Sequence, residues 1–437
     1  MKNRVDFSAA RRLLLLALAA AVALLPIRMR TAGAEAPSGF EYLEVDGKAV
    51  ITGYSGEAAD LTIPETLDGL PVAAVRDLGI QSDVGTITIP DSVALEDGAI
   101  SFCSALREIR VSENHPSLRL IDGVLFSKDA KTLLCYPSEF PGEIYTVPEG
   151  TEAIGAGAFW DCPFLREVVL PEGLKVIGTD AFGLCIKLTA MEIPVSVEVI
   201  GEMAFANAAF ESLDLSGNIQ LKEVSARLAS GCWQLSAVSL PDSITRIGDE
   251  AFAFTALASF ELPASVEIIG INPFRGCADL QVITLTGAED RFTFVSPFLI
   301  DIQADTAICC VPTVSGDISL PEVSRIGDFC CFCCDGIIGI EIPHPLRQIG
   351  QYAFASSYAL ETVTIRQADS LVIGDGVFED CPGLSALTIL GSVAAIGTDA
   401  FSGNDLLTHV ITDSDTVRAY FSGTDIQVAV SPEGIPE

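Results

Sequence analysis

Histidine and tryptophan are nearly absent from this chain of 437 residues, which contains three histidines and two tryptophans. His115, His344 and His409 lie far apart in the sequence. No His-Glu-x-x-His motif, phosphate-binding loop or Gly-x-Ser-x-Gly turn occurs. The sequence therefore lacks the signatures of common metal-dependent, nucleotide-dependent and serine hydrolase sites. We expect no catalytic residues, no metal site and no cofactor.

Basic residues are scarce as well. Lysine and arginine total 25, against 59 aspartate and glutamate residues, which gives a formal net charge of −34. A field of this sign repels nucleic acid and anionic lipid, and it keeps a protein soluble. It predicts no nucleic-acid partner and favours a protein partner of basic character. The same excess is typical of a plain solvated surface, and the sequence leaves both interpretations open.

Long apolar runs are limited to one segment near the N-terminus. Basic residues precede Leu13–Leu25, which is shorter than the roughly 20 residues that span a bilayer. Ala32-Gly33-Ala34 then offers a small-residue cleavage site. We predict that residues 1–34 are a secretory signal peptide, with an uncleaved anchor as the alternative. The mature chain is then expected to be secreted or held at the cell surface, with no membrane insertion after cleavage.

The chain contains a repeated sequence motif, Ile-Gly-x-x-Ala-Phe-x-x-Cys-x-x-Leu-x-x-Val-x-Ile-Pro. Adjacent copies are 22 to 24 residues apart, and a degenerate copy of the motif starts at Val224. The clear copies begin at Ile154, Ile177, Ile200, Ile247, Ile269, Ile326, Ile349, Ile373 and Ile396. A fixed period of this size predicts a solenoid, because one thin unit cannot bury its own apolar residues and must stack on its neighbours.

The apolar residues of the repeat predict its strands and its core. Leu-x-x-Val-x-Ile ends in the alternation typical of a half-buried strand, and such strands stack in parallel about 4.8 Å apart. The glycine after isoleucine is expected to permit a tight turn, and the proline to end the strand. Strands are predicted near residues 166–170, 190–193, 238–240, 260–262, 340–342 and 363–365. The repeat phenylalanines are expected to form one buried column, made of Phe159, Phe182, Phe205, Phe252, Phe274, Phe354, Phe378 and Phe401.

Other passages precede or interrupt the repeats. Residues 42–72 contain two short Asp-Gly turns between apolar segments, and Leu120–Pro137 has the pattern of a hairpin around Asp122-Gly123. A second segment, from Phe298 to Pro312, has a weaker hairpin pattern that lacks the Asp-Gly turn. Together with the repeat motif, these passages resemble the BspA-like leucine-rich repeat family of bacterial surface proteins, with the first passage as the opening cap.

The resemblance implies a fold more strongly than a function. It implies an α/β-type repeat solenoid, namely a right-handed leucine-rich repeat solenoid of about a dozen coils with short parallel strands and β-hairpin inserts. The expected organisation is a signal peptide (1–34), an N-terminal cap (35–75), a solenoid (76–409) with inserts near 112–148 and 286–320, and a C-terminal cap and tail (410–437). No catalytic residues accompany the resemblance.

Seven of the thirteen cysteines occupy the repeat's own Cys position, where other copies carry Ala208, Thr255, Ser357 or Asn404. This interchange predicts a small buried slot that tolerates a weak hydrogen-bond donor. A denser group runs from Cys309 to Cys334. The sequence leaves three interpretations open for it: free buried thiols, a disulfide favoured by export, or a metal site that lacks the usual Cys-x-x-Cys pairs.

The outward positions of the strands offer a candidate binding surface. Small polar and acidic residues dominate there and aromatic residues are absent, so a groove that stacks sugars is not favoured. The candidate partner-binding residues are Glu192, Asp214, Glu261 and Glu341. We expect an exported, non-enzymatic protein-interaction or adhesion module with a host or bacterial surface protein as its ligand. The alternatives are a structural envelope or scaffold protein without a specific ligand, and a thiol or metal protein built on the 309–334 cysteines.

Overall fold

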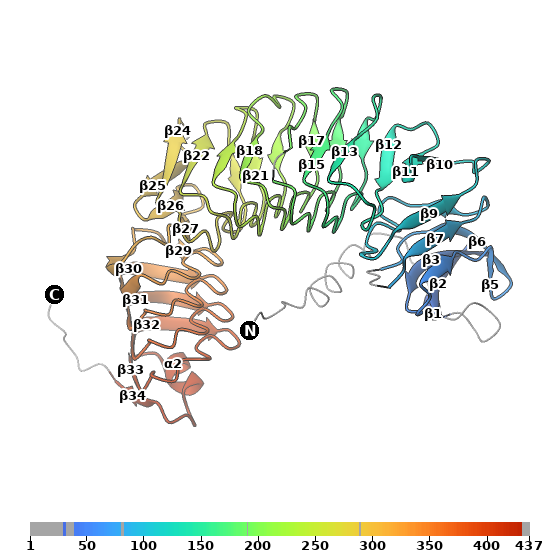
Figure 1. Ribbon diagram of the computed structural model, residues 1–437. Coiled ribbons are helices and arrows are strands. Elements are labelled where there is room, and N and C mark those ends of the chain that lie inside the picture. Colours follow the sequence, from blue (N-terminus) through green and yellow to red (C-terminus); the bar gives the residue numbers. More distant parts are fainter. Residues whose placement is uncertain (1–28, 32–38, 80–82, 190, 288–289, 431–437) are drawn as a thin grey trace.

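The computed structural model describes residues 29–31, 39–79, 83–189, 191–287 and 290–430. These residues form an arc of stacked coils (Figure 1). Within them there is a single α-helix, α2 (Asp415–Tyr420), and the segments between strands are turns. The structure therefore confirms a β-solenoid, whereas the α/β part of the predicted class is not confirmed. The handedness and the number of coils stay predictions.

Each regular coil contributes to two ladders of parallel strands. The first, which we call the strand ladder, contains the predicted Leu-x-x-Val-x-Ile segments, and its register stacks equivalent positions, as in Leu213 against Val238. Its members are β4 (Asp60–Thr62), β7 (Thr86–Ile89), β9 (Glu108–Val111), β13 (Ile144–Thr146), β15 (Glu167–Val169), β18 (Ser212–Asp214), β20 (Ala237–Ser239), β22 (Ser259–Pro263), β24 (Val282–Thr286), β28 (Gly316–Ser319), β30 (Ile337–Ile349), β31 (Thr362–Ile373), β32 (Ala386–Ile396), β33 (His409–Thr412) and β34 (Gln427–Ala429).

The second ladder was not predicted. We call it the anchor ladder, because its two-residue strands end on the isoleucine or valine that opens each repeat, as in Ile177 against Ile200. Its two-residue members are β14 (Ala153–Ile154), β16 (Val176–Ile177), β17 (Val199–Ile200), β19 (Glu223–Val224), β21 (Arg246–Ile247), β23 (Ile268–Ile269) and β29 (Arg325–Ile326). In the last coils the two ladders merge, and β30, β31 and β32 each run through both.

Two predicted strand features are wrong. No strand is formed at residues 191–193, and residue 190 lies outside the described residues. The next coil is one residue shorter between Ile200 and Leu213 than the equivalent span from Ile154 to Val168, so the neighbouring backbones lose register. Proline also does not always end a strand, since β30 continues through Pro343 and Pro345. A register shift against β31 falls at these prolines, where a missing N–H is tolerated.

Both hairpin inserts are present and feed into the anchor ladder. The first consists of β10 (Leu118–Ile121), β11 (Val124–Ser127) and β12 (Thr132–Cys135), and the second of β25 (Phe292–Val295), β26 (Phe298–Asp301) and β27 (Thr306–Cys310). The third strand of each insert pairs in parallel with the next anchor strand, so Leu133 stacks on Ile154 and Ala307 on Ile326. Each insert thus replaces one turn of the solenoid and begins a new run of anchor strands, because β12 and β27 pair with the following anchor strand and not with the preceding one.

The N-terminal end of the arc is closed by a mixed sheet. Its strands are β1 (Met29–Thr31), β2 (Phe40–Val45), β3 (Lys48–Tyr54), β5 (Thr66–Leu67), β6 (Leu70–Val75) and β8 (Ala94–Leu95). Strand β1 falls inside the predicted signal peptide, most of which lies outside the described residues, and it pairs with β2. The signal peptide stays a prediction. No helix in the described ranges is long and apolar enough to cross a membrane.

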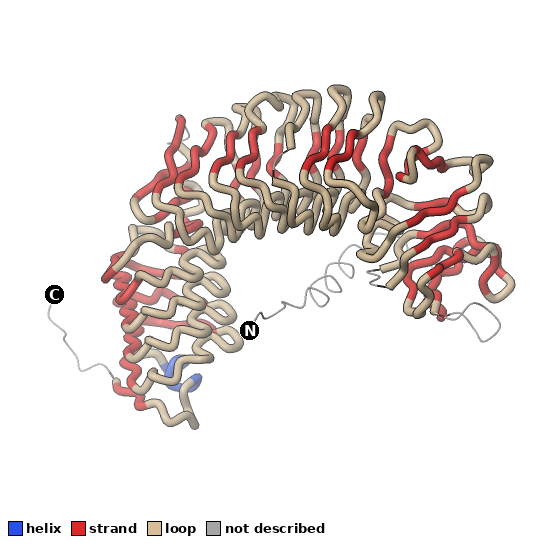
Figure 2. The backbone as a smooth tube through the Cα atoms, viewed as in Figure 1, coloured by secondary structure: helices blue, strands red, loops and turns tan. Residues whose placement is uncertain are grey.

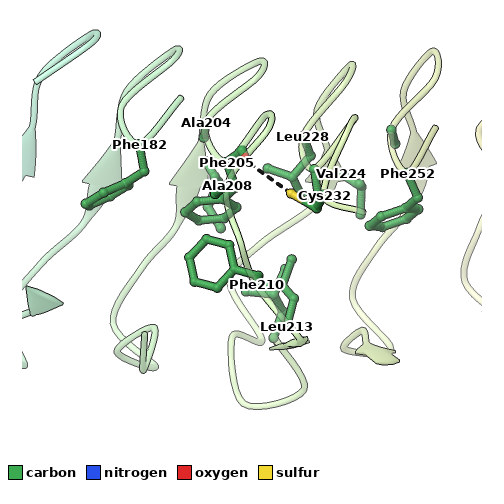
Figure 3. Close-up of a cluster of buried hydrophobic side chains, with 14 of the residues drawn as sticks. Phe182, Ala204, Phe205, Ala208, Phe210, Leu213, Val224, Leu228, Cys232 and Phe252 are labelled. Atoms are coloured by element: carbon green, nitrogen blue, oxygen red, sulfur yellow. Dashed lines mark hydrogen bonds between the residues drawn. The ribbon is translucent and has the colours of Figure 1, made fainter. Parts of the chain in front are cut away.

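The repeat phenylalanines are all buried, as predicted, but they do not form one column. Phe159, Phe182 and Phe205 stack with ring centroids 5.0 and 6.0 Å apart. Figure 3 shows the interruption that follows, where Leu228 and Cys232 separate Phe205 from Phe252. A second interruption occurs at the second insert and the coil after it, where Cys331 takes the phenylalanine position. The apolar core divides within that insert, with Leu299 in one cluster and Phe298 in the next. The phenylalanine column is therefore three stacks.

The repeat's Cys position is a donor site with a defined acceptor. Cys232 Sγ donates to the carbonyl oxygen of Phe205, one coil earlier, at 3.0 Å (Figure 3). The same bond is made by Cys185 to Phe159, Cys277 to Phe252, Cys381 to Phe354, Asn404 to Phe378 and Ser357 to Cys331. A buried carbonyl oxygen benefits from a donor, which explains Cys, Ser and Asn at this slot, although Ala208 occupies it in one coil without a side-chain donor.

Most coils contain two residues in the left-handed backbone region, at the third and seventh positions after the anchor isoleucine. Asp161, Asn207 and Asp380 are examples, and asparagine and aspartate tolerate this conformation better than other L-residues. Bulky aromatic residues occupy the same positions at Phe254, Phe329 and Tyr352. These turns follow the inner edge of the arc, while the strands lie toward its outer edge (Figure 2).

Asp161 should make the stability of the fold depend on pH. Burial, together with the nearby Glu139 carboxylate, raises the pKa of Asp161 from 3.8 to about 6. Folded Asp161 holds its proton more tightly than the unfolded chain does, so stability falls as the pH rises from about 4 to about 6. We expect Asp161→Asn to be more stable than wild type at pH 7 by about 1 kcal/mol, after discounting for solvent screening of this half-buried group.

The measurement is the free energy of unfolding of both proteins at pH 4 and pH 7. At pH 4 the two should be nearly equal, because wild-type Asp161 is then protonated in the folded state. Asparagine keeps the left-handed backbone at this position (φ 51°), so the variant isolates the charge. A variant that is less stable than wild type at pH 7 would contradict this account.

Candidate interaction surface

Three of the predicted acids, Asp214, Glu261 and Glu341, lie on the strand ladder, where every second side chain points away from the core. Glu192 lies at residues 191–193, which form no strand. Glu192, Asp214, Glu261 and Glu341 are all exposed. The register does not bring all four together. Asp214 stacks on Ser239, Glu261 on Thr284, and Glu341 lies between Ser319 and Thr364. Hydroxyl residues therefore separate most of the carboxylates, which limits the repulsion between acids of neighbouring coils.

Local contacts occupy two of these carboxylates. Glu341 Oε1 accepts a hydrogen bond from Arg366 Nε at 2.6 Å, across one coil. Asp214 Oδ1 accepts from the backbone N–H of Ser216 at 2.9 Å, and this bond lowers the pKa of the Asp214 carboxyl. Within the described residues, no ion pair involves Glu192 or Glu261. These two are the acids of the strip best placed to attract a cationic partner.

The inner edge of the arc presents aromatic side chains that the strand-face analysis missed. Trp233 is 69% exposed, and its ring lies 5.8 Å from that of Phe254. Phe329 stacks on Tyr352 with centroids 5.3 Å apart. The signal was present in the sequence, because these aromatic residues stand at turn positions that hold glycine or aspartate in other copies. Only the fold shows that these positions share one face.

The thirteen cysteines all carry free thiols, and every one except Cys333 is fully buried. In the dense group, the Cys310 backbone N–H donates to the Cys330 carbonyl at 2.8 Å, which brings the two halves of the group into adjacent coils. Burial raises the pKa of the Cys309 and Cys331 thiols. In the part of the chain that the structure describes, no cluster of His, Cys, Asp and Glu is arranged to hold a metal ion.

Thiol reactivity should follow this burial. Burial, assisted by Asp335, raises the pKa of Cys333 to about 11, yet Cys333 is the one cysteine with a partly exposed side chain. Burial raises the pKa of Cys232 to about 12. Since the thiolate is the reactive form, we expect slow alkylation of the native protein at pH 8, with Cys333 modified first.

Mapping iodoacetamide-modified peptides over time by mass spectrometry measures this order. Cys333→Ser should remove the earliest product and leave the remaining time course unchanged. Denaturation should expose all thirteen thiols at once. Early labelling of Cys162 or Cys185 in the native protein would show that the ladder is not closed to solvent.

The fold and its surfaces define a repeat protein that presents an extended face rather than an enclosed cleft. A family model described as the BspA type leucine rich repeat region matches residues 152–281 and 313–424 in six copies. The chain belongs to this family. A comparison with curated proteins gave no match.

Solved structures of bacterial leucine-rich repeat proteins are similar to this chain. A leucine rich cell surface protein from Faecalibacterium prausnitzii A2-165 is 21% identical, with a TM-score of 0.53 over 94% of this chain and 96% of that one. The pneumococcal vaccine antigen PcpA is 16% identical, with a TM-score of 0.42 over 93% of this chain and 99% of that one. A leucine-rich repeat protein from Bacteroides ovatus ATCC 8483 is 17% identical, with a TM-score of 0.34 over 94% and 100%. At these identities the first likeness supports the fold alone.

Proposed function

We propose that this chain is an exported, non-enzymatic module of the bacterial surface that binds another protein through the surface of its solenoid. The observation that carries the proposal is the stack of coils between β4 and β34, in which ladders of parallel strands hold equivalent side chains of successive repeats in rows. A rigid row of side chains lowers the ordering cost of binding. Membership of the family supports the same conclusion.

The partner is proposed to be a protein of basic character. The excess of acidic residues raises the association rate with a cationic surface and makes that rate sensitive to salt. On the outer side, Glu192, Asp214, Glu261 and Glu341 are the proposed contacts. A scaffold without a specific ligand is the second candidate, and it is favoured by the separation of these acids along the ladder.

Surface capture tests the proposal. The purified protein is cross-linked to intact bacterial and host cells, and captured proteins are identified by mass spectrometry. We expect a small, reproducible set of proteins whose capture weakens as salt rises. A scaffold without a ligand would capture nothing above a control protein of equal charge, and that result would overturn the proposal.

Variants then locate the contact. Glu192→Gln, Asp214→Asn, Glu261→Gln and Glu341→Gln are combined in one protein. A matched control neutralises four exposed acids elsewhere, through Glu57→Gln, Glu149→Gln, Glu172→Gln and Asp242→Asn. If the strand face binds the partner, only the first variant loses affinity and salt dependence. Equal affinity for both variants would move the contact to another face.

A further inference from the structure

A pocket of about 260 Å³ lies on the turn side of the coils, and four successive turn segments build it. Arg275 comes from the coil that opens at Ile269, Phe329 and Phe332 from the next, Tyr352 from the third and Asp380 from the fourth. The second hairpin insert replaces the turn between the first two coils, so residues 57 positions apart meet directly. Asn272 Nδ2 donates to the Phe329 carbonyl oxygen at 2.7 Å across this junction.

One wall of the pocket is aromatic. The rings of Phe329 and Tyr352 are nearly parallel, with an interplanar angle of 11°, and Phe332 meets Phe329 edge-on at 5.8 Å. All three side chains are partly exposed. Phe329 and Tyr352 hold left-handed backbones, with φ of 56° and 53°, which bulky residues adopt rarely. The conformation is common to the repeat, since Met203, Arg227 and Glu250 hold it in other coils, and only the aromatic pair is particular to these two coils.

Arg275 belongs to the wall rather than to the open space. Its guanidinium carbon lies 4.1 Å from the Phe329 ring centroid and 4.5 Å from that of Phe332. Its Nη1 lies 3.3 Å from Glu250 Oε1, so its charge is compensated from behind. The arginine therefore packs against two of the rings, and among the described residues no cation lies over the ring of Tyr352.

Glu379 and Asp380 also line the pocket and bring two carboxylates to it. Both are at least partly exposed, and in the described part of the chain neither forms an ion pair. The pocket thus combines flat aromatic faces with two uncompensated negative charges. A guanidinium fits both, because it is planar, stacks on aromatic rings and binds carboxylates through paired N–H donors. An ammonium satisfies the charge but not the flat geometry.

We propose that this pocket takes an arginine side chain of the protein partner. The inference rests on the proposed function, and it adds the recognised group and a second contact on the opposite side of the coils from the strand face. Its volume is below the roughly 300–1,000 Å³ of sites for whole small molecules, and it suits one inserted side chain. The net charge of −34 draws such a basic partner toward the arc.

The test uses the full chain and the probe N-acetyl-Gly-Arg-Gly-amide, titrated by saturation-transfer difference NMR. The matched probe replaces arginine with citrulline, which keeps the shape and removes the charge. We expect the arginine peptide to bind at least tenfold more tightly than the citrulline peptide, with the lysine peptide between them. The double variant Glu379→Gln/Asp380→Asn should lose at least tenfold in affinity for the arginine peptide. Asparagine tolerates the left-handed backbone of position 380.

The control is Glu172→Gln/Asp242→Asn, which removes the same charge from exposed loops and should stay within twofold of wild type. Equal binding of the arginine and citrulline peptides, or wild-type affinity in the double variant, would overturn the inference. Binding of a neutral oligosaccharide that the double variant loses, without discrimination between the peptides, would assign the pocket to a glycan and would also overturn it.

The two proposals fail separately. If surface capture yields no protein while the peptides are still discriminated, the proposed function fails and the chemistry of the pocket stands. If a partner is captured and the double variant binds it with wild-type affinity, the function stands and the arginine pocket is overturned.

Discussion

Replacing Phe182 with alanine is expected to lower the free energy of unfolding by about 3–5 kcal/mol. The Phe182 ring is fully buried and lies between Phe159 and Phe205, nearly parallel to Phe159 at an interplanar angle of 8°. Truncation removes contacts on both ring faces at once. The coils on either side cannot collapse into the space, because the anchor ladder and turn hydrogen bonds such as Phe182 N–H to the Ala204 carbonyl (2.7 Å) fix their separation.

Urea unfolding followed by circular dichroism measures this effect, and hydrogen exchange shows whether the loss is local to the coils from Ile154 to Ile200. The control is Phe164→Ala, which truncates a ring that is 40% exposed in the same region and should cost far less. A Phe182→Ala protein with an unchanged midpoint would show that the stack does not support the solenoid.

Replacing Gly201 with alanine is expected to destabilise the solenoid by about 3 kcal/mol, the upper end of the usual cost of overpacking. A Cβ atom at this position would lie 2.4 Å from the Thr179 backbone nitrogen and 2.7 Å from the Gly178 carbonyl carbon. These are backbone atoms of the neighbouring coil and cannot rotate away. The coils would have to separate, which would stretch the hydrogen bond from Gly201 N–H to the Ile177 carbonyl (2.8 Å).

Gly173→Ala is the matched control, because a Cβ there would meet nothing within 4 Å. Thermal unfolding of the two variants should differ clearly, with Gly173→Ala close to wild type. If both glycine variants unfold at the same temperature as wild type, the coils are packed less closely than the structure indicates. From the sequence, the glycine after isoleucine was expected to permit a tight turn. In the structure, Gly201 does not have a left-handed backbone, and glycine is required there because two backbones approach closely.

The two proposed contacts lie on different sides of each coil. The strand face offers exposed acids on a regular ladder, and the turn face offers a pocket with aromatic walls and free carboxylates. A partner that contacts one side alone should lose affinity in only one of the two variants, the four-residue strand variant or the Glu379/Asp380 variant. Losses in both variants that add in the combined protein would indicate a partner that reaches around the edge of the solenoid.

Much of this fold was predictable because it depends on the pattern of residues within each repeat. The spacing of Ile, Phe, Cys, Leu and Val determined the period, the stacked coils and the identity of the buried residues, since burial follows the local alternation of apolar side chains. The same local alternation explains why most of the predicted strands are confirmed, namely those near 166–170, 238–240, 260–262, 340–342 and 363–365. The acidic composition likewise predicted the character of the surface, although not the place where a partner binds.

What joins one coil to the next could not be predicted from a single repeat. The anchor ladder, the carbonyl acceptor of each Cys-position donor and the contact that requires Gly201 depend on which atoms of neighbouring coils face one another. The pocket with Arg275, Tyr352 and Asp380 depends further on the second insert, which removes a turn and brings distant positions together. The sequence by itself determined the repeating unit, because its apolar pattern is local. The tertiary structure alone decided the interior contacts and the candidate pocket, because these arise from register between coils.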